Sequence, residues 1–184
     1  MKKFFGAALV LGSIAVAYAA TATSGLNTGE YVSAFEPNHV TGPHAGTKTC
    51  PPCTFGQLPQ VQMWVNGDDA ENVASLAKLL NDTMAARKES KLHTFVIFVT
   101  DGKNKDAMQA KIKKMSEKVG NTVAMAWVDK NDQSVDDYKI NTASDVKNTI
   151  FVYKKMKVVE KFVNLKADAK GKSALTKAID TITK

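Results

Sequence analysis

The feature that most constrains the fold is an ordered alternation of short, β-branched apolar runs with longer amphipathic stretches between residues 60 and 184. Two of the runs, residues 95–99 (FVIFV) and 122–128 (TVAMAWV), are almost continuously apolar, which is typical of strands buried on both faces of a parallel sheet. Each follows a stretch in which apolar residues recur every three or four positions, the period of a helix with one buried side. Strands that alternate with helices in this way predict an α/β domain.

The predicted elements follow the order β-α-β-α-β-(α)-β-β-α. The first strand covers residues 61–65 (VQMWV), where positions alternate with a period of two. The helix after it can be capped by Asp68 or Asp69 and continues to about Lys88. The later elements are a strand at 95–99, a helix from about 105 to 119, a strand at 122–128, a helical turn at 134–138, a hairpin of strands at 149–153 and 158–163, and a C-terminal helix with Leu175, Ile179 and Ile182 on one face.

The N-terminal part of the chain differs from this regular region. Residues 20–59 are irregular and rich in Gly, Pro, Thr and Asn, with one strand-like piece at residues 31–35 (YVSAF). We expect this segment to precede a single domain formed by residues 60–184. About 165 residues remain after a signal peptide is removed, which is enough for one domain with a sizeable core.

The first nineteen residues have the pattern of a secretory signal peptide. Lys2 and Lys3 precede an apolar stretch at residues 4–16, and residues 17–19 (AYA) form a small-x-small cleavage site. The apolar stretch is too short to span a bilayer comfortably. We therefore expect residues 1–19 to be removed, and the mature protein to be secreted or periplasmic in a bacterium, without stable insertion in the membrane.

The charge of the chain argues against a nucleic-acid partner. The full sequence has 25 basic and 18 acidic residues, a net charge of +7, and without the two lysines of the signal peptide the balance is 23 minus 18, or +5. All basic residues but Arg87 are Lys, and they are scattered along the chain. Nucleic-acid-binding surfaces more often show clustered Arg with aromatic side chains between them.

Three stretches carry a resemblance to a known family: residues 95–118 (FVIFVTDGKNKDAMQAKIKKMSEK), 123–140 (VAMAWVDKNDQSVDDYKI) and 148–162 (NTIFVYKKMKVVEKF). In this order they resemble the thioredoxin-like superfamily, and within it the redoxin or peroxiredoxin-like branch, which has an extra βα unit before the terminal hairpin. The resemblance implies a three-layer α/β fold in which helices cover both faces of a central mixed sheet.

A second resemblance involves the cysteines. Residues 50–65 (CPPCTFGQLPQVQMWV), with VTGP at residues 40–43, are similar to a set of exported bacterial thioredoxin-like proteins that carry Cys-x-x-Cys before the first core strand. That set has no firmly assigned activity, so this similarity supports the fold more than the function.

The chain departs from the active members of the superfamily at two positions. Thioredoxins and peroxiredoxins carry the reactive Cys after the first core strand, where this chain has residues 66–70 (NGDDA). Thioredoxins also place a cis-Pro before the hairpin strand, where this chain has residues 147–149 (KNT). An alignment with Cys50 at the head of the active helix fails, because residues 42–49 (GPHAGTKT) cannot form the buried strand that it requires. We therefore expect the usual active site to be vacant.

Cys50 and Cys53, the only cysteines, leave two interpretations open. Their spacing suits thiol–disulfide exchange with thiols or disulfides of other exported proteins, in which one sulfur attacks and the other resolves the mixed disulfide. Lys48, His44 and the absence of acidic residues between positions 37 and 67 favour a thiolate. Which cysteine attacks, and the oligomeric state, are left open by the sequence.

The other interpretation is a non-catalytic thioredoxin-fold binding protein with a structural Cys50–Cys53 disulfide. Pro51 and Pro52 offer no N–H groups, and Gly56 and Pro59 would stop a helix after about one turn, so help from a helix dipole should be weak. Closing a four-residue loop, however, stabilises a fold by only about 2 kcal/mol in the chain-entropy picture.

A minor alternative is metal binding. His39, His44, Cys50 and Cys53 have the spacing His-x4-His-x5-Cys-x2-Cys, a ligand set that suits zinc or copper. A single Cys-x-x-Cys without a second pair is a weak signal. No organic cofactor is expected, and Thr54 stands where covalent c-type haem attachment requires His.

Overall fold

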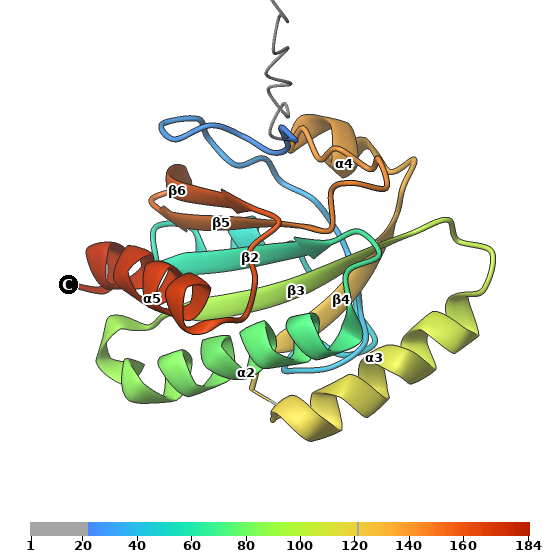
Figure 1. Cartoon of the computed structure of the whole chain (residues 1–184), viewed down its shortest axis with the longest axis horizontal. Coiled ribbons are helices and arrows are strands. Elements are labelled where there is room, and N and C mark those ends of the chain that lie inside the picture. The colour runs from blue at the N-terminus through green and yellow to red at the C-terminus, as the bar shows by residue number, and fades with distance from the viewer. Residues whose placement is uncertain (1–21, 121) are drawn as a thin grey trace, which may run out of the picture.

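One mixed sheet of six strands organises the computed structural model, which describes residues 22–120 and 122–184 (Figure 1). The predicted signal peptide, residues 1–19, lies outside the described residues. The strand order is β1-β4-β3-β2-β5-β6. The strands are β1 (Asn38–His39), β2 (Gln60–Val65), β3 (His93–Thr100), β4 (Ala124–Asp129), β5 (Asn148–Lys154) and β6 (Lys157–Val163). Strands β2, β3 and β4 are parallel, whereas β1, β5 and β6 are antiparallel to their neighbours.

The helices follow the predicted order. They are α1 (Pro51–Phe55), α2 (Ala70–Ala86), α3 (Lys105–Val119), α4 (Gln133–Asp137) and α5 (Ala169–Thr183), with a 3-10 turn η1 (Lys88–Ser90) after α2. Asp69 caps α2, because its carboxylate accepts the backbone N–H groups of Glu71 and Asn72. The predicted α/β order and the mixed sheet are confirmed.

Helices α2, α3 and α5 cover one face of the sheet (Figure 1). Their apolar stripes pack against alternate residues of the strands, as the helical period of the sequence predicts. The buried residues on this face include Val61, Met63 and Val65 of β2, Leu76 and Leu80 of α2, Ile112 of α3, and Leu175, Ile179 and Ile182 of α5.

The opposite face is covered by the short helix α4 and by the N-terminal segment, residues 22–59. Leu26, Val32 and Phe35 of this segment are buried there together with Trp64 of β2 and Tyr138, which follows α4. The ring of Phe35 lies 5.2 Å from that of Trp64 and 5.1 Å from that of Tyr138, measured between centroids. The segment is therefore the third layer of the fold over much of this face.

The structure corrects one sequence expectation and adds an element. Residues 31–35 do not form the predicted strand; Tyr31 makes only an isolated bridge with Lys157. Backbone hydrogen bonds join residues 29–32 to residues 156–158 over a short length, and Val32 and Phe35 are buried against the sheet. A two-residue strand that the sequence did not predict, β1, adds to the edge of the sheet beside β4.

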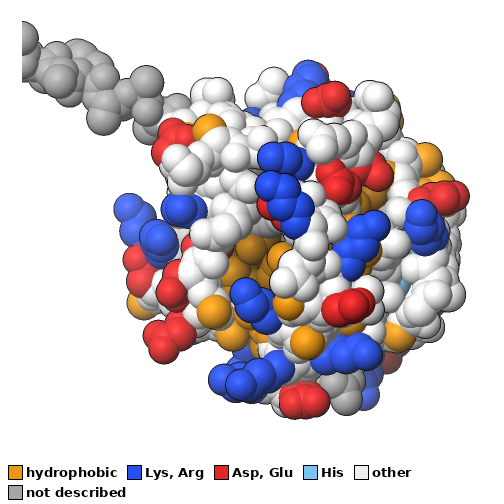
Figure 2. Space-filling view, turned by 90° about the vertical axis from the view of Figure 1, so that its right-hand side faces the viewer, with side chains coloured by type: hydrophobic (Ala, Val, Ile, Leu, Met, Phe, Trp, Pro, Cys, Tyr) orange, Lys and Arg blue, Asp and Glu red, His pale blue; other side chains and the backbone are white. Residues whose placement is uncertain are grey.

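The charged residues are dispersed, as the scattered lysines of the sequence predict. On the face shown in Figure 2, Lys and Arg side chains alternate with Asp and Glu side chains around several hydrophobic areas. Within residues 22–120 and 122–184, no helix has the length and apolar character needed to cross a membrane.

Candidate functional site

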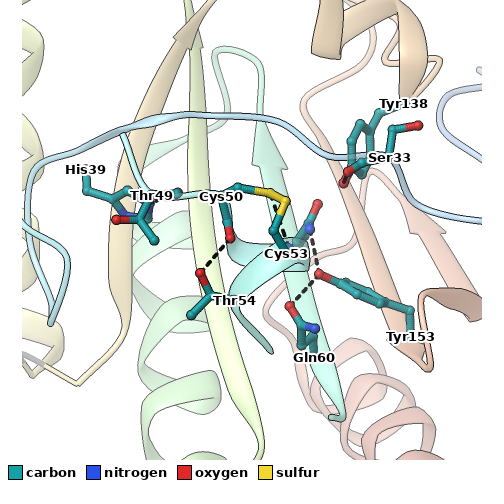
Figure 3. Close-up of a disulfide and its surroundings, with 10 residues drawn as sticks. Ser33, His39, Thr49, Cys50, Cys53, Thr54, Gln60, Tyr138 and Tyr153 are labelled. Atoms are coloured by element: carbon teal, nitrogen blue, oxygen red, sulfur yellow. Dashed lines mark hydrogen bonds between the residues drawn. A yellow bond between two sulfur atoms is a disulfide. The ribbon is translucent and has the colours of Figure 1, made fainter. Parts of the chain in front are cut away.

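The cysteine pair is held by the single helical turn α1. Cys50 caps the turn and Cys53 lies within it, and they form a disulfide with a Cα–Cα distance of 5.3 Å (Figure 3). Pro51 and Pro52 occupy the first positions, where a helix does not need the missing N–H groups. Thr54 closes the turn, because its N–H and its hydroxyl both donate to the carbonyl of Cys50, at 3.0 and 2.9 Å.

The turn lies upstream of the first core strand, as the sequence predicts. It ends at Gly56, whose φ is 40°, and Pro59 immediately precedes β2. Phe55 anchors the turn on the sheet, with its ring 3.6 Å from the ring of His93 and 5.7 Å from that of Phe95, between centroids. Both partners belong to β3, so α1 rests on the face that the N-terminal segment covers.

The two cysteines are not equivalent. Cys53 is exposed, whereas Cys50 is half-buried. The backbone N–H of Cys53 donates to Sγ of Cys50 at 3.2 Å. The cysteine that is open to solvent is therefore Cys53, and the sulfur that accepts a hydrogen bond from the protein belongs to Cys50.

A buried polar network lies in the surroundings of the disulfide (Figure 3). The hydroxyl of Tyr153 accepts a hydrogen bond from Nε2 of Gln62 at 2.6 Å and donates to Oε1 of Gln60 at 2.8 Å. Trp64 completes the network, because its Nε1 donates to Oε1 of Gln62 at 3.1 Å. Burial raises the pKa of Tyr153 well above its usual range, so this phenol keeps its proton and donates.

The three histidines of the chain gather around Phe55, which sequence analysis did not anticipate. The ring of His93 stacks on that of Phe55, the ring of His44 lies 5.9 Å from that of Phe55, and the rings of His39 and His44 lie 5.6 Å apart, between centroids. Nε2 of His39 is 2.8 Å from the carbonyl of Thr49, directly before Cys50. Burial lowers the pKa of both His39 and His93, and the nearby His44 lowers both further.

This histidine group predicts that acid weakens the fold. Because the folded state holds His39 and His93 below the ordinary pKa of 6.5, the unfolded chain binds more protons as the pH falls. Their contribution is complete above about pH 6.5 and is lost as the pH drops through the folded pKa values, at up to about 1 kcal/mol for each histidine near pH 5.5. Urea unfolding between about pH 7.5 and 5.5 measures this loss. The double variant His39→Gln/His93→Gln should flatten the dependence; an unchanged slope would show that other groups cause it.

The four candidate metal ligands do not form a metal site. Cys50 and Cys53 are joined to each other, and His39 directs Nε2 to the carbonyl of Thr49. Over the described part of the chain, no group of three or more His, Cys, Asp or Glu side chains is arranged to hold a metal ion. Nothing in these residues supports the metal hypothesis.

The position of the usual reactive Cys is occupied by a hydrogen-bonded structural network. Oδ2 of Asp68 accepts from Nδ2 of Asn72 at 2.7 Å and from Nδ2 of Asn148 at 2.6 Å. Asn148 begins β5, at the place where thioredoxins have their cis-Pro, and there is no cis peptide bond within residues 22–120 and 122–184. The hydrogen bond between Asp68 and Asn148 thus joins the position of the usual reactive Cys to the position of the usual cis-Pro. The sequence suggested a cap at Asp68 but not this pairing.

The roles of Gln60, Gln62 and Tyr153 were not predicted from the sequence. A signal for the two glutamines existed, because they are polar residues at alternate positions of a strand whose neighbours are all apolar or aromatic. Polar groups on a buried face need partners within the protein. Their partner, Tyr153, is 91 residues from Gln62 and 93 from Gln60, and no local pattern links them.

Comparison with known proteins identifies the fold. No family model matches the chain, and no curated protein matches its sequence. Among solved structures, it is similar to the peroxidoxin BcpB from Mycobacterium tuberculosis, with 15% identity and a TM-score of 0.63 over 88% of this chain and 100% of the other.

Two further structures are similar. One is the thioredoxin domain of a thiol-disulfide oxidoreductase from Bacteroides vulgatus, with 14% identity and a TM-score of 0.62 over 86% of this chain and 99% of the other. The other is a secreted disulfide oxidoreductase from M. tuberculosis, with 12% identity and a TM-score of 0.56 over 80% and 95% of the two chains. At these identities the likeness establishes a thioredoxin-like fold and nothing finer.

Proposed function

We propose that this chain, with its thioredoxin-like fold, is an exported protein that exchanges disulfides with the thiols or disulfides of other exported proteins through Cys50 and Cys53. The observation that carries the proposal is the asymmetry of the bridge, with an exposed Cys53 and a half-buried Cys50 on a surface turn. Export to the periplasm or the medium rests on the sequence pattern of residues 1–19.

The exposed cysteine defines the order of steps. An incoming substrate thiolate attacks Sγ of Cys53, forming a bond between this sulfur and the substrate sulfur. The Cys50–Cys53 bond breaks and its electron pair leaves with Cys50 as a thiolate. A second substrate thiolate then attacks the substrate sulfur of the mixed disulfide, which forms a substrate disulfide and releases Cys53. The substrate is oxidised by two electrons and the protein disulfide is reduced to a dithiol.

The surroundings of Cys50 support its role as the leaving and resolving sulfur. The backbone N–H of Cys53 donates to Sγ of Cys50 at 3.2 Å, and such a hydrogen bond favours a negatively charged sulfur. No acidic residue occurs between positions 37 and 67, so the segment around α1 adds no like charge to a thiolate. In the reverse reaction, Cys53 attacks a substrate disulfide and Cys50 resolves the mixed disulfide.

The bridge contributes little as a staple, which also favours an exchanging pair. A disulfide stabilises mainly by restricting the unfolded chain, and a loop of four residues gives only about 2 kcal/mol. The turn holds itself together independently through the two hydrogen bonds from Thr54 to Cys50. We therefore expect the turn to persist in the reduced protein.

Titration of the two thiols in glutathione buffers tests the proposal. We expect a reduction potential well above about −300 mV, the region in which structural disulfides lie. The ratio of oxidised to reduced protein is read by alkylation and mass spectrometry at each buffer composition. A potential below that region, together with no insulin reduction and no oxidation of a reduced protein substrate, would contradict the proposal and leave the binding protein with a static bridge.

The two single cysteine variants should differ in a defined way. Cys50→Ser retains the exposed cysteine and loses the resolving one, so with oxidised glutathione it should accumulate a stable mixed disulfide and release one reduced glutathione. Cys53→Ser retains only the half-buried sulfur and should form this adduct at least about tenfold more slowly, because thiol exchange depends on access. The adduct is measured by intact mass over time, with the double variant as the blank. Equal rates for both variants would remove the assignment of Cys53 as the attacked sulfur, and a faster rate for Cys53→Ser would reverse it.

A further inference from the structure

A groove between α2 and α3 lies away from the disulfide, over the carboxyl ends of β2 and β3, where ligands commonly bind in α/β sheets. It has a volume of about 760 Å³, within the range of small-molecule sites. Figure 2, which views the molecule from the side of α3, shows a hollow with a hydrophobic floor and basic side chains around it. The apolar lining includes Val65, Val73, Phe98, Met108, Ile112 and Met115.

The rim of the groove is basic on the side of α3. Lys111, Lys114 and Lys118 line it, and their spacing of three and four residues places them on one side of the helix. All three are exposed, and none of them takes part in an ion pair within residues 22–120 and 122–184. Three ammonium groups therefore stand above an apolar floor without an anionic partner.

The lining also carries three acidic residues, Asp68, Glu71 and Asp101, so its formal charge is balanced and the lysines are confined to the side of α3. Asp68 is held by Asn72 and Asn148, and Asp101 lies 3.8 Å from Lys103 and accepts its backbone N–H. Glu71 lies in the first turn of α2, where a negative charge is stabilised by the helix dipole. Because these acidic residues lie after β2, in the first turn of α2 and after β3, an anionic head group on the side of α3 meets the lysines.

We infer that this groove binds a single-chain amphiphile with an anionic head group, such as a long-chain fatty acid. The acyl chain lies on the apolar floor, and the carboxylate meets the lysines of α3. Met108 and Met115, which are half-buried, adapt to chains of different shape because their side chains are unbranched and flexible. This inference does not depend on disulfide exchange, since the groove contains no cysteine.

The apolar floor predicts that affinity depends on the length of the acyl chain, and the lysines of the rim predict that it depends on the charge of the head group. Laurate, myristate and palmitate, added below their aggregation limits, should bind with affinities that rise by up to about fourfold for each methylene. Dodecyltrimethylammonium, which has a comparable chain and the opposite charge, should bind at least about tenfold more weakly than laurate. Isothermal titration calorimetry on the full mature chain measures both series.

Matched variants locate the site. Lys111→Gln/Lys114→Gln/Lys118→Gln should weaken myristate binding by about tenfold, because each exposed charge contributes a fraction of a kcal/mol. Lys166→Gln/Lys170→Gln/Lys177→Gln changes the net charge equally at exposed positions outside the groove and should leave the affinity unchanged. Met115→Glu places a carboxylate beside the floor and should abolish binding, while its far-ultraviolet circular dichroism confirms the fold.

Four results would overturn the inference, three of them from the binding measurements. They are equal effects of the two lysine triple variants, affinities that do not depend on chain length, and equal binding of the cationic amphiphile. A fourth is self-association in sedimentation experiments that Met115→Glu removes, because the groove would then hold a second copy of the chain rather than an amphiphile.

Discussion

Replacement of Gly25 by Ala is expected to lower the free energy of unfolding by about 2–5 kcal/mol. Gly25 has a φ of +83°, a conformation that costs an L-residue about 1–2 kcal/mol. A Cβ there would lie 2.7 Å from the ring of Phe151 and 2.7 Å from Cγ2 of Thr149, and overpacking of this kind costs about 1–3 kcal/mol more. Both partners are buried in β5, so neither can move away easily.

Gly29 provides the matched control for this variant. Its φ is +92°, so Gly29→Ala has the same backbone cost, but the new Cβ would meet only Cε of Lys157, at 3.8 Å. Urea unfolding should therefore show Gly25→Ala to be less stable than Gly29→Ala by about 1–3 kcal/mol. Equal losses would mean that Gly25 does not pack against the sheet as the structure has it.

The variant also tests how the N-terminal segment is attached. Gly25 donates its N–H to the carbonyl of Lys139 at 2.7 Å and accepts from Nζ of Lys161 at 3.1 Å. When the close approach to β5 is lost, these contacts should open first, because they attach the buried residues around Gly25 to the rest of the fold. We expect faster amide hydrogen exchange in residues 22–35 than in β2 and β3.

Most of the sheet and its long helices could be predicted from the sequence, because their signals are local. Residues 95–99 and 122–128 are apolar on both faces, and the central parallel strands β3 and β4 are indeed covered on both. The cap at Asp69 and the turn before β2 were also readable, since each depends on residues a few positions apart.

The N-terminal segment could not be predicted, because its structure depends on distant partners. Residues 31–35 have the composition of a strand, yet only their first two residues pair with the start of β6, and Val32 and Phe35 are buried in the cluster that contains Trp64 and Tyr138. Strand propensity is decided by such packing more than by the backbone. A segment of this kind has no periodic signal in the sequence.

The location of the cysteine turn could be predicted from the sequence, but the difference in exposure between its two cysteines could not. The spacing of the prolines and Gly56 predicted a single turn before the first core strand, and α1 is such a turn. The difference in exposure between Cys50 and Cys53 arises from how the turn rests on β3 through Phe55. The assembly of His39, His44 and His93 also depends on distant partners, since His93 belongs to β3 and the other two to the N-terminal segment.

The buried hydrogen bonds between β2 and β5 pair residues far apart in the sequence, and their loss should lower the free energy of unfolding substantially. Tyr153→Phe removes one hydroxyl and leaves two buried amide atoms without partners, Nε2 of Gln62 and Oε1 of Gln60. Each buried group left unpaired costs about 1–3 kcal/mol, so we expect a loss of about 2–6 kcal/mol in the free energy of unfolding, measured in urea. Tyr138→Phe provides the comparison, because this equally buried phenol donates to the carbonyl of Ser33 at 2.7 Å and shares only Gln62 with the network.

A compensating change separates unpaired polar atoms from loss of packing. Gln60→Met in the Tyr153→Phe background removes one of the two orphaned atoms at similar volume, and it also removes Nε2 of Gln60, a buried atom with no hydrogen-bond partner among the described residues. The double variant should therefore be more stable than Tyr153→Phe alone by about 1–3 kcal/mol. If Gln60→Met costs the same free energy in both backgrounds, the two side chains are not coupled, and the hydroxyl of Tyr153 does not hold Gln60.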